Sequence, residues 1–159
     1  MKYLISTLII YTNLMFSQNI DNEYSRIEDG SYFYDYLLFR NSSEGSFIKY
    51  THHGKLENKF NYLKNENNLI LNCELKKPYN FIIYRDLLID KKNREIYIDL
   101  KKYLEFHQKK FIIKNKIIES IDDKNFKILK NIKSNNWIVG YDAYEKYGYD
   151  YVLGILEIE

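Results

Sequence analysis

Short runs that alternate between apolar and polar residues are the feature that most restricts how this chain can fold. The clearest run spans residues 68–76, where Leu69, Leu71, Cys73 and Leu75 fall at alternate positions with polar residues between most of them. Successive side chains of a strand point to opposite faces, so this spacing predicts a strand with one buried face. Similar runs recur along the chain and favour a structure built mostly from antiparallel strands.

The amino-acid composition supports the same fold class. The chain has 17 tyrosines and 9 phenylalanines but one proline, and aromatic and β-branched residues suit the half-buried surface of a sheet. The expected architecture is one mostly β domain over residues 19–159, an antiparallel barrel or curved sandwich of about 8–10 short strands with one or two short helices. Strand-like patterns cover residues 31–40, 46–51, 56–63, 68–76, 79–85, 94–100, 111–119, 126–132, 137–144 and 149–158.

Two of the expected local structures involve a helical pattern. The segment 56–63 favours a strand but also admits a helix, because Leu56, Phe60 and Leu63 fall at helical spacing. Asp99 is expected to cap a short helix, because a carboxylate at a helix start accepts hydrogen bonds from free backbone N–H groups.

Two hairpins are predicted from turn-like residues between strands. Residues 52–55 contain a glycine suited to a tight turn between two strands. Near the C-terminus, a four-residue loop at 145–148 would place Trp137 opposite Leu156 in a second hairpin. Gly154 would then leave room for Val139 or a neighbouring ring and let the strand bend.

The first 18 residues have the organisation of a cleavable signal peptide. Lys2 supplies a positive charge, and residues 3–16 are mainly apolar and contain no Asp, Glu, Lys or Arg. This stretch is shorter than the roughly 20 apolar residues that span a membrane, so we expect no stable membrane span after cleavage. We expect cleavage near Ser17 or Gln18 and a mature protein that is secreted or periplasmic. The alternative is that the stretch forms the first buried element of the domain.

The charge pattern argues against a nucleic-acid partner. The formal net charge is +2, and acidic residues separate the lysine pairs instead of leaving a basic block. Nucleic-acid binding surfaces need clustered positive charge. The glycines form neither a phosphate-binding loop nor a dinucleotide-binding motif, so no cofactor is expected.

Histidine and cysteine provide no recognisable metal or nucleophile site. His52 and His53 are adjacent, and an extended chain would point them to opposite sides; His107 is the remaining histidine. We expect no metal, because these residues lack ligand spacing. Cys73 is the single cysteine, and its place on an apolar strand face predicts a small buried hydrophobe, not a nucleophile.

Adjacent acidic residues are the basis of the enzymatic alternative. Asp122 with Asp123, and Glu28 with Asp29, could supply a general acid and base, which would make the chain a small secreted hydrolase using paired carboxylates. The competing interpretation is that these acids are solvated turn residues.

Tyrosines near the C-terminus are the strongest candidates for a binding surface. A tyrosine combines an apolar ring with a polar tip and suits both interfaces and ligand stacking. The favoured hypothesis is an exported, non-catalytic protein that binds a small apolar or saccharide ligand or a protein partner, by analogy with lipocalin-like barrels. The candidate ligand-binding residues, placed around the tip of the C-terminal hairpin, are Tyr141, Asp142, Tyr144, Tyr147, Tyr149 and Tyr151.

Overall fold

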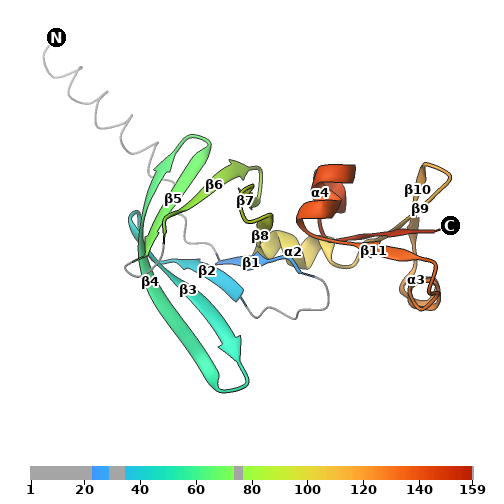
Figure 1. Cartoon of the computed structure of the whole chain (residues 1–159), viewed down its shortest axis with the longest axis horizontal. Helices are drawn as coiled ribbons and strands as arrows, with labels where there is room; N and C mark the ends of the chain where they lie inside the picture. Colours follow the sequence, from blue (N-terminus) through green and yellow to red (C-terminus); the bar gives the residue numbers. More distant parts are fainter. Residues whose placement is uncertain (1–22, 29–34, 74–76, 159) are drawn as a thin grey trace, which may run out of the picture.

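The computed structural model describes residues 23–28, 35–73 and 77–158, and within them the mostly β architecture is confirmed. Eight antiparallel strands close into a barrel, and a smaller four-stranded sheet with short helices follows (Figure 1). The expected signal peptide, residues 1–18, lies outside the described residues and stays a prediction. No helix within the described ranges is long and apolar enough to cross a bilayer.

The barrel follows the order of the sequence. Each strand pairs with the next, and β1 also pairs with β8 to close the cylinder. Its strands are β1 (Glu23–Arg26), β2 (Asp35–Phe39), β3 (Glu44–Thr51), β4 (Gly54–Asn65), β5 (Asn68–Cys73), β6 (Tyr79–Tyr84), β7 (Leu87–Asp90) and β8 (Glu95–Asp99).

Strands β3 and β4 form the predicted hairpin. Thr51 pairs with Gly54 across a turn of His52 and His53, and Gly54 has a φ of 118°, a conformation that favours glycine. The strand predicted over 56–63 is confirmed as part of β4, and the helical alternative is wrong.

The inner face of the barrel is filled by apolar side chains from all eight strands. The buried face predicted for 68–76 is confirmed for Leu69 and Leu71, and the half-buried Cys73 packs against the same cluster. Residues 74–76 lie outside the described part. The core residues are Tyr24, Leu37, Phe39, Phe60, Tyr62, Leu69, Leu71, Phe81, Leu88 and Tyr97, with Phe47 packed against them.

Strands β7 and β8 are also buried on the outside of the barrel. The outward residues of both strands pack with aromatic residues from the C-terminal part of the chain, including Tyr144 and Tyr149. All four residues of β7 are buried, so this strand lacks alternation and has no counterpart among the predicted strands.

Helix α2 (Leu100–Phe106) begins where the barrel ends, and its predicted cap is confirmed. Oδ1 of Asp99 accepts hydrogen bonds from the backbone N–H groups of Lys101 and Lys102, at 2.9 and 3.3 Å. These bonds satisfy donors that the first helical turn leaves free.

The second sheet has the strand order β10–β9–β12–β11, in which β12 runs parallel to β9. Helix α3 lies between β10 and β11 in the sequence, and α4 and the 3-10 helix η1 lie between β11 and β12. The elements are β9 (Lys110–Lys114), β10 (Ile117–Ile121), α3 (Asp123–Lys130), β11 (Asn136–Ile138), α4 (Tyr141–Tyr147), η1 (Tyr149–Tyr151) and β12 (Ile155–Glu157).

The strand predicted over 126–132 is wrong, because this segment belongs mainly to α3. Oδ1 of Asp122 accepts a hydrogen bond from the Asn125 N–H at 2.9 Å and caps the helix. Phe126 is buried and packs edge-on against Trp137, with 5.1 Å between ring centroids. The Asp122 cap and the burial of Phe126 therefore favour a helix here, although the residue pattern resembles that of a strand.

The predicted C-terminal hairpin is confirmed at its base and wrong at its tip. Trp137 lies opposite Leu156 in the antiparallel pair of β11 and β12, as expected. In place of a four-residue loop at 145–148, the chain between these strands forms α4 and η1. Gly140 and Gly148, with φ of 67° and 92°, flank α4 and permit the reversals at its two ends.

Candidate functional site

Among the described residues, the barrel interior leaves no room for a ligand. Rings interlock across it, with centroids 5.0 Å apart for Phe39 and Tyr62 and 5.5 Å apart for Phe81 and Tyr97. The cavity left among the inner side chains measures about 10 Å³. Sites for drug-sized ligands occupy roughly 300–1,000 Å³, so these residues form a packed core and not a lipocalin-like lumen.

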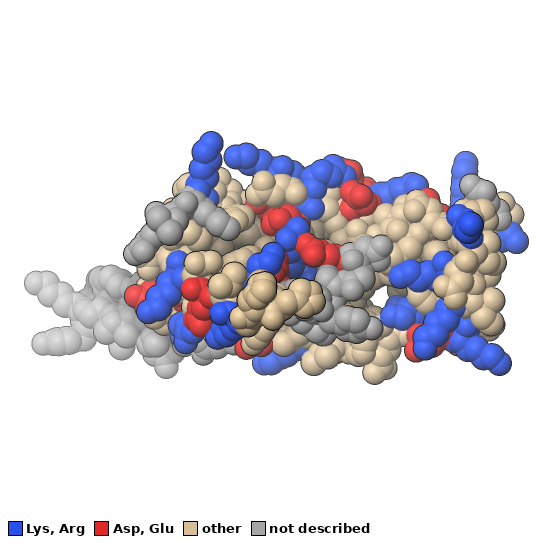
Figure 2. Space-filling model, turned by 60° about the horizontal axis from the view of Figure 1, so that its bottom comes forward, with Lys and Arg blue, Asp and Glu red and all other residues tan. Residues whose placement is uncertain are grey.

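A larger hollow lies outside the barrel, where its end meets the C-terminal elements. This groove has a volume of about 880 Å³, and acidic and basic side chains lie close together across the middle of the face in Figure 2. The residues lining the groove are Arg26, Ile27, Glu28, Arg94, Glu95, Asn136, Trp137, Ile138, Val139, Tyr141, Asp142, Glu145 and Lys146.

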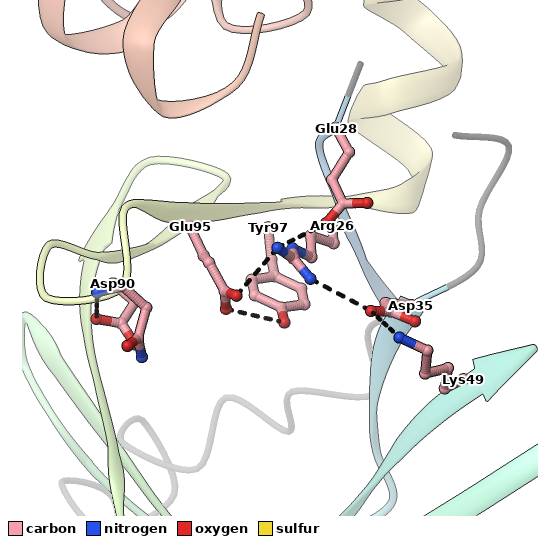
Figure 3. Close-up of polar contacts among 8 residues, drawn as sticks. Arg26, Glu28, Asp35, Lys49, Asp90, Glu95 and Tyr97 are labelled. Carbon is pink, nitrogen blue, oxygen red and sulfur yellow. Dashed lines mark hydrogen bonds and ion pairs between the residues drawn. The ribbon is translucent and has the colours of Figure 1, made fainter. Parts of the chain in front are cut away.

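The barrel wall of the groove is organised around Arg26. Its guanidinium is 2.6 Å from Glu28, 3.1 Å from Glu95 and 3.4 Å from Asp35, measured between N and O atoms (Figure 3). Arg26 lies opposite Tyr97 in the pairing of β1 with β8, which places this polar network at one end of the barrel core. Burial opposes its charge, but the neighbouring carboxylates hold the pKa of Arg26 above its usual value.

Behind Arg26, Asp35 is 93% buried. Its Oδ2 is also 3.6 Å from the Lys49 Nζ, whereas its Oδ1 has no hydrogen-bond partner within the described ranges. Burial raises the pKa of Glu95, and the charge of Arg26 opposes this shift. Burial also raises the pKa of Tyr97, whose hydroxyl is 3.5 Å from Glu95.

The opposite wall of the groove is formed by α4. Arg94, in the turn before β8, donates from Nη2 to Asp142 at 2.7 Å and to Glu145 at 2.9 Å, and its guanidinium lies 4.5 Å from the Tyr141 ring centroid. These hydrogen bonds raise the pKa of Arg94. The residue therefore links the β7–β8 turn to α4.

Helix α4 separates the residues predicted to form one platform. Tyr141 and Asp142 line the groove. Tyr144 and Tyr149 instead pack against Tyr84 on the outside of the barrel, with centroids 6.3 and 6.2 Å away.

The remaining two predicted residues face the second sheet. Tyr151 packs edge-on against Phe111, with 5.1 Å between ring centroids, and the Tyr147 hydroxyl donates to Glu157. The structure therefore divides these six residues between the groove, the outside of the barrel and the second sheet, because α4 and η1 replace the expected hairpin tip. Their role in binding a ligand stays a prediction.

The histidines and Asp122, considered above as candidates for metal binding or catalysis, lie in a turn, beside a helix end and at a helix cap. His52 and His53 are exposed in the β3–β4 turn, and His107 stacks on Tyr103 beyond α2. No group of three potential metal ligands occurs within residues 23–28, 35–73 and 77–158. Asp122 caps α3.

Of the acidic pairs proposed from the sequence, Asp122 and Asp123 are not among the residues that line the groove. Glu28 contacts Arg26, and Asp29 lies outside the described residues. Asp35 and Glu95 come from strands that are far apart in the sequence but both pair with β1, and the two carboxylates share the guanidinium of Arg26. Only the strand register reveals this relationship. Each directs an oxygen toward Arg26, so the two carboxylates flank a cation instead of facing one another.

A scan against protein-family models finds no match to this chain, and searches of curated proteins and of solved structures also find none.

Proposed function

We propose that this chain is an exported, non-catalytic binding protein whose ligand or partner occupies the groove between the barrel end and α4. The observation that carries this proposal is the contrast between the groove, at about 880 Å³, and the barrel interior, at about 10 Å³. The groove is concave, and the aromatic residues Trp137 and Tyr141 lie on it beside polar groups that could fix the orientation of a ligand. Export rests on the pattern of residues 1–18.

The salt bridges favour binding over the hydrolase alternative. A general base needs a carboxylate that can accept a proton from substrate or water. Arg26 engages Asp35 and Glu95, and Arg94 engages Asp142 and Glu145. Charged walls also suit a polar ligand or a protein segment better than a small apolar ligand.

The test is to recover the protein from its native compartment and identify what accompanies it by mass spectrometry. Glu145→Lys reverses one charge on the groove wall, where the side chain is 56% exposed. Glu119→Lys makes the same change at an exposed position of β10, away from the groove.

We expect one species to accompany the wild type and Glu119→Lys but not Glu145→Lys. Equal recovery with all three proteins would show that the groove is not the binding surface. An N-terminus close to Gln18 would support export, whereas an intact Met1 in a cytoplasmic pool would contradict it.

A further inference from the structure

The free edge of β11 forms one side of the groove. Strand β11 pairs with β12 on one side, and within the described residues no strand pairs with its other side. The consecutive residues Asn136, Trp137, Ile138 and Val139 all line the groove. Successive side chains of a strand point to opposite faces, so a hollow that touches every residue runs along the backbone edge.

The groove closes at one end of this edge. A Cβ built on Gly140 would lie 2.9 Å from the carbonyl oxygen of Ile27, so the two segments meet there. Along β11 and Val139, the residue after it, no described strand pairs with this side of the backbone over about four residues, or roughly 13 Å at strand spacing. Unpaired backbone N–H and C=O groups along such an edge can pair with another extended chain.

The charges around this edge favour a cationic occupant. Salt bridges join three carboxylates to Arg26 and two carboxylates to Arg94, which leaves negative charge in excess on both walls. Lys146 also lines the groove, but Glu157 pairs with it. Lys49 adds a further cation only on the far side of Asp35.

We propose that an extended polypeptide segment bearing lysine or arginine side chains adds to the edge of β11 and directs a cationic group between Glu28 and Glu145. This deepens the proposed function, on which it rests, by naming the class of partner. Main-chain pairing with β11 orients the bound segment, and the excess of carboxylates over arginines on the groove walls favours basic side chains.

The probe is the peptide acetyl-Val-Lys-Val-Lys-Val-amide, added to the full mature chain. Trp137 is the single tryptophan and is among the residues that line the groove. Its indole packs against Phe126 and Gly154, so its fluorescence reports pairing at the backbone edge beside it. We expect a saturable change in emission that weakens as salt is raised.

Three matched ligands separate charge from strand pairing. The peptide with glutamate in place of lysine should produce no saturable change. The lysine peptide N-methylated at alternate backbone amides keeps its charge but loses donors, and it should bind at least tenfold more weakly. Lysine amide, which offers the cation without a strand, should bind more weakly still.

Two protein variants locate the site. Glu28→Gln and Glu145→Gln should each weaken the lysine peptide at least threefold, whereas Glu119→Gln should not. Failure of the lysine peptide to bind, or equal binding of its glutamate or N-methylated counterpart, would overturn the proposal.

The outcome for this proposal is distinguishable from that for the proposed function. If the lysine peptide fails while the native species still depends on Glu145, the groove binds a different chemical class. If the native species is indifferent to Glu145→Lys, the proposed function itself fails.

Discussion

The indole of Trp137 occupies the space that a side chain at residue 154 would fill. A Cβ built on Gly154 would lie 2.0 Å from two carbons of the ring, and Gly154 has a φ of 125°. The contact joins β11 to the segment that enters β12. Glycine is therefore required at this position for two reasons: the backbone conformation and the close approach of the Trp137 ring.

Gly154→Ala should lower the free energy of unfolding by about 3–5 kcal/mol, from backbone strain and from displacement of the indole. Gly148→Ala is the matched control, because its φ is 92° but its Cβ would have no neighbour within 4 Å. That variant should cost less, about 1–3 kcal/mol from backbone strain alone. Urea unfolding measures both, and equal losses would show that the ring contact contributes nothing.

Asp99→Ala should destabilise the protein by about 0.5–2 kcal/mol through loss of the α2 cap. Asp99→Asn retains an oxygen that can accept from Lys101 and Lys102, so it should recover most of that loss. Thermal and urea unfolding of the two variants provide the measurement. If asparagine is as damaging as alanine, capping is not what Asp99 contributes.

The barrel was largely predictable because most of its strands have one inward and one outward face. Leu69 and Leu71 show this difference directly as alternation. Strand β7 does not, since helices and the barrel core bury both of its faces. The sequence pattern of α4 wrongly predicted a strand. Its tyrosines have high strand propensity, but tertiary contacts such as that of Tyr144 with Tyr84 stabilise a helix.

The candidate groove was only partly predictable. Tyr141 and Asp142 were identified from the tyrosine-rich segment, although the expected backbone was wrong. Arg26 and Glu95 carry a weaker signal: each is a charged residue two positions from an inward-facing tyrosine in its strand. Interpreting that signal requires the pairing of β1 with β8, which residue spacing alone does not provide.

Arg94→Lys should loosen α4 with little effect on global stability. A lysine keeps the charge but lacks the planar fork that lets arginine contact Asp142 and Glu145 together. The residues are exposed, so the free energy of global unfolding should change little. Hydrogen exchange of the amides of residues 141–147 should become faster, and unchanged exchange there would contradict the proposed link between the turn and the helix.

Glu95 should make stability depend on pH in a defined direction. Burial raises its pKa in the folded protein above the ordinary value of 4.5, so the folded state binds this proton more tightly than the unfolded chain does. Protonated Glu95 therefore adds to the free energy of unfolding below pH 4.5, and this contribution is lost as the pH rises through the higher folded pKa.

Glu95→Gln removes this titration. Losing the salt bridge to Arg26 adds an offset, but the proton linkage appears as the slope against pH. Over the window that begins near pH 4.5 and extends upward to the raised folded pKa, the free energy of unfolding of the wild type should fall relative to that of Glu95→Gln. Glu66→Gln, in the exposed turn between β4 and β5, should follow the wild type. Urea unfolding at several pH values across this window tests the sign, and a difference that is constant or runs the other way would mean that burial does not control the titration of Glu95.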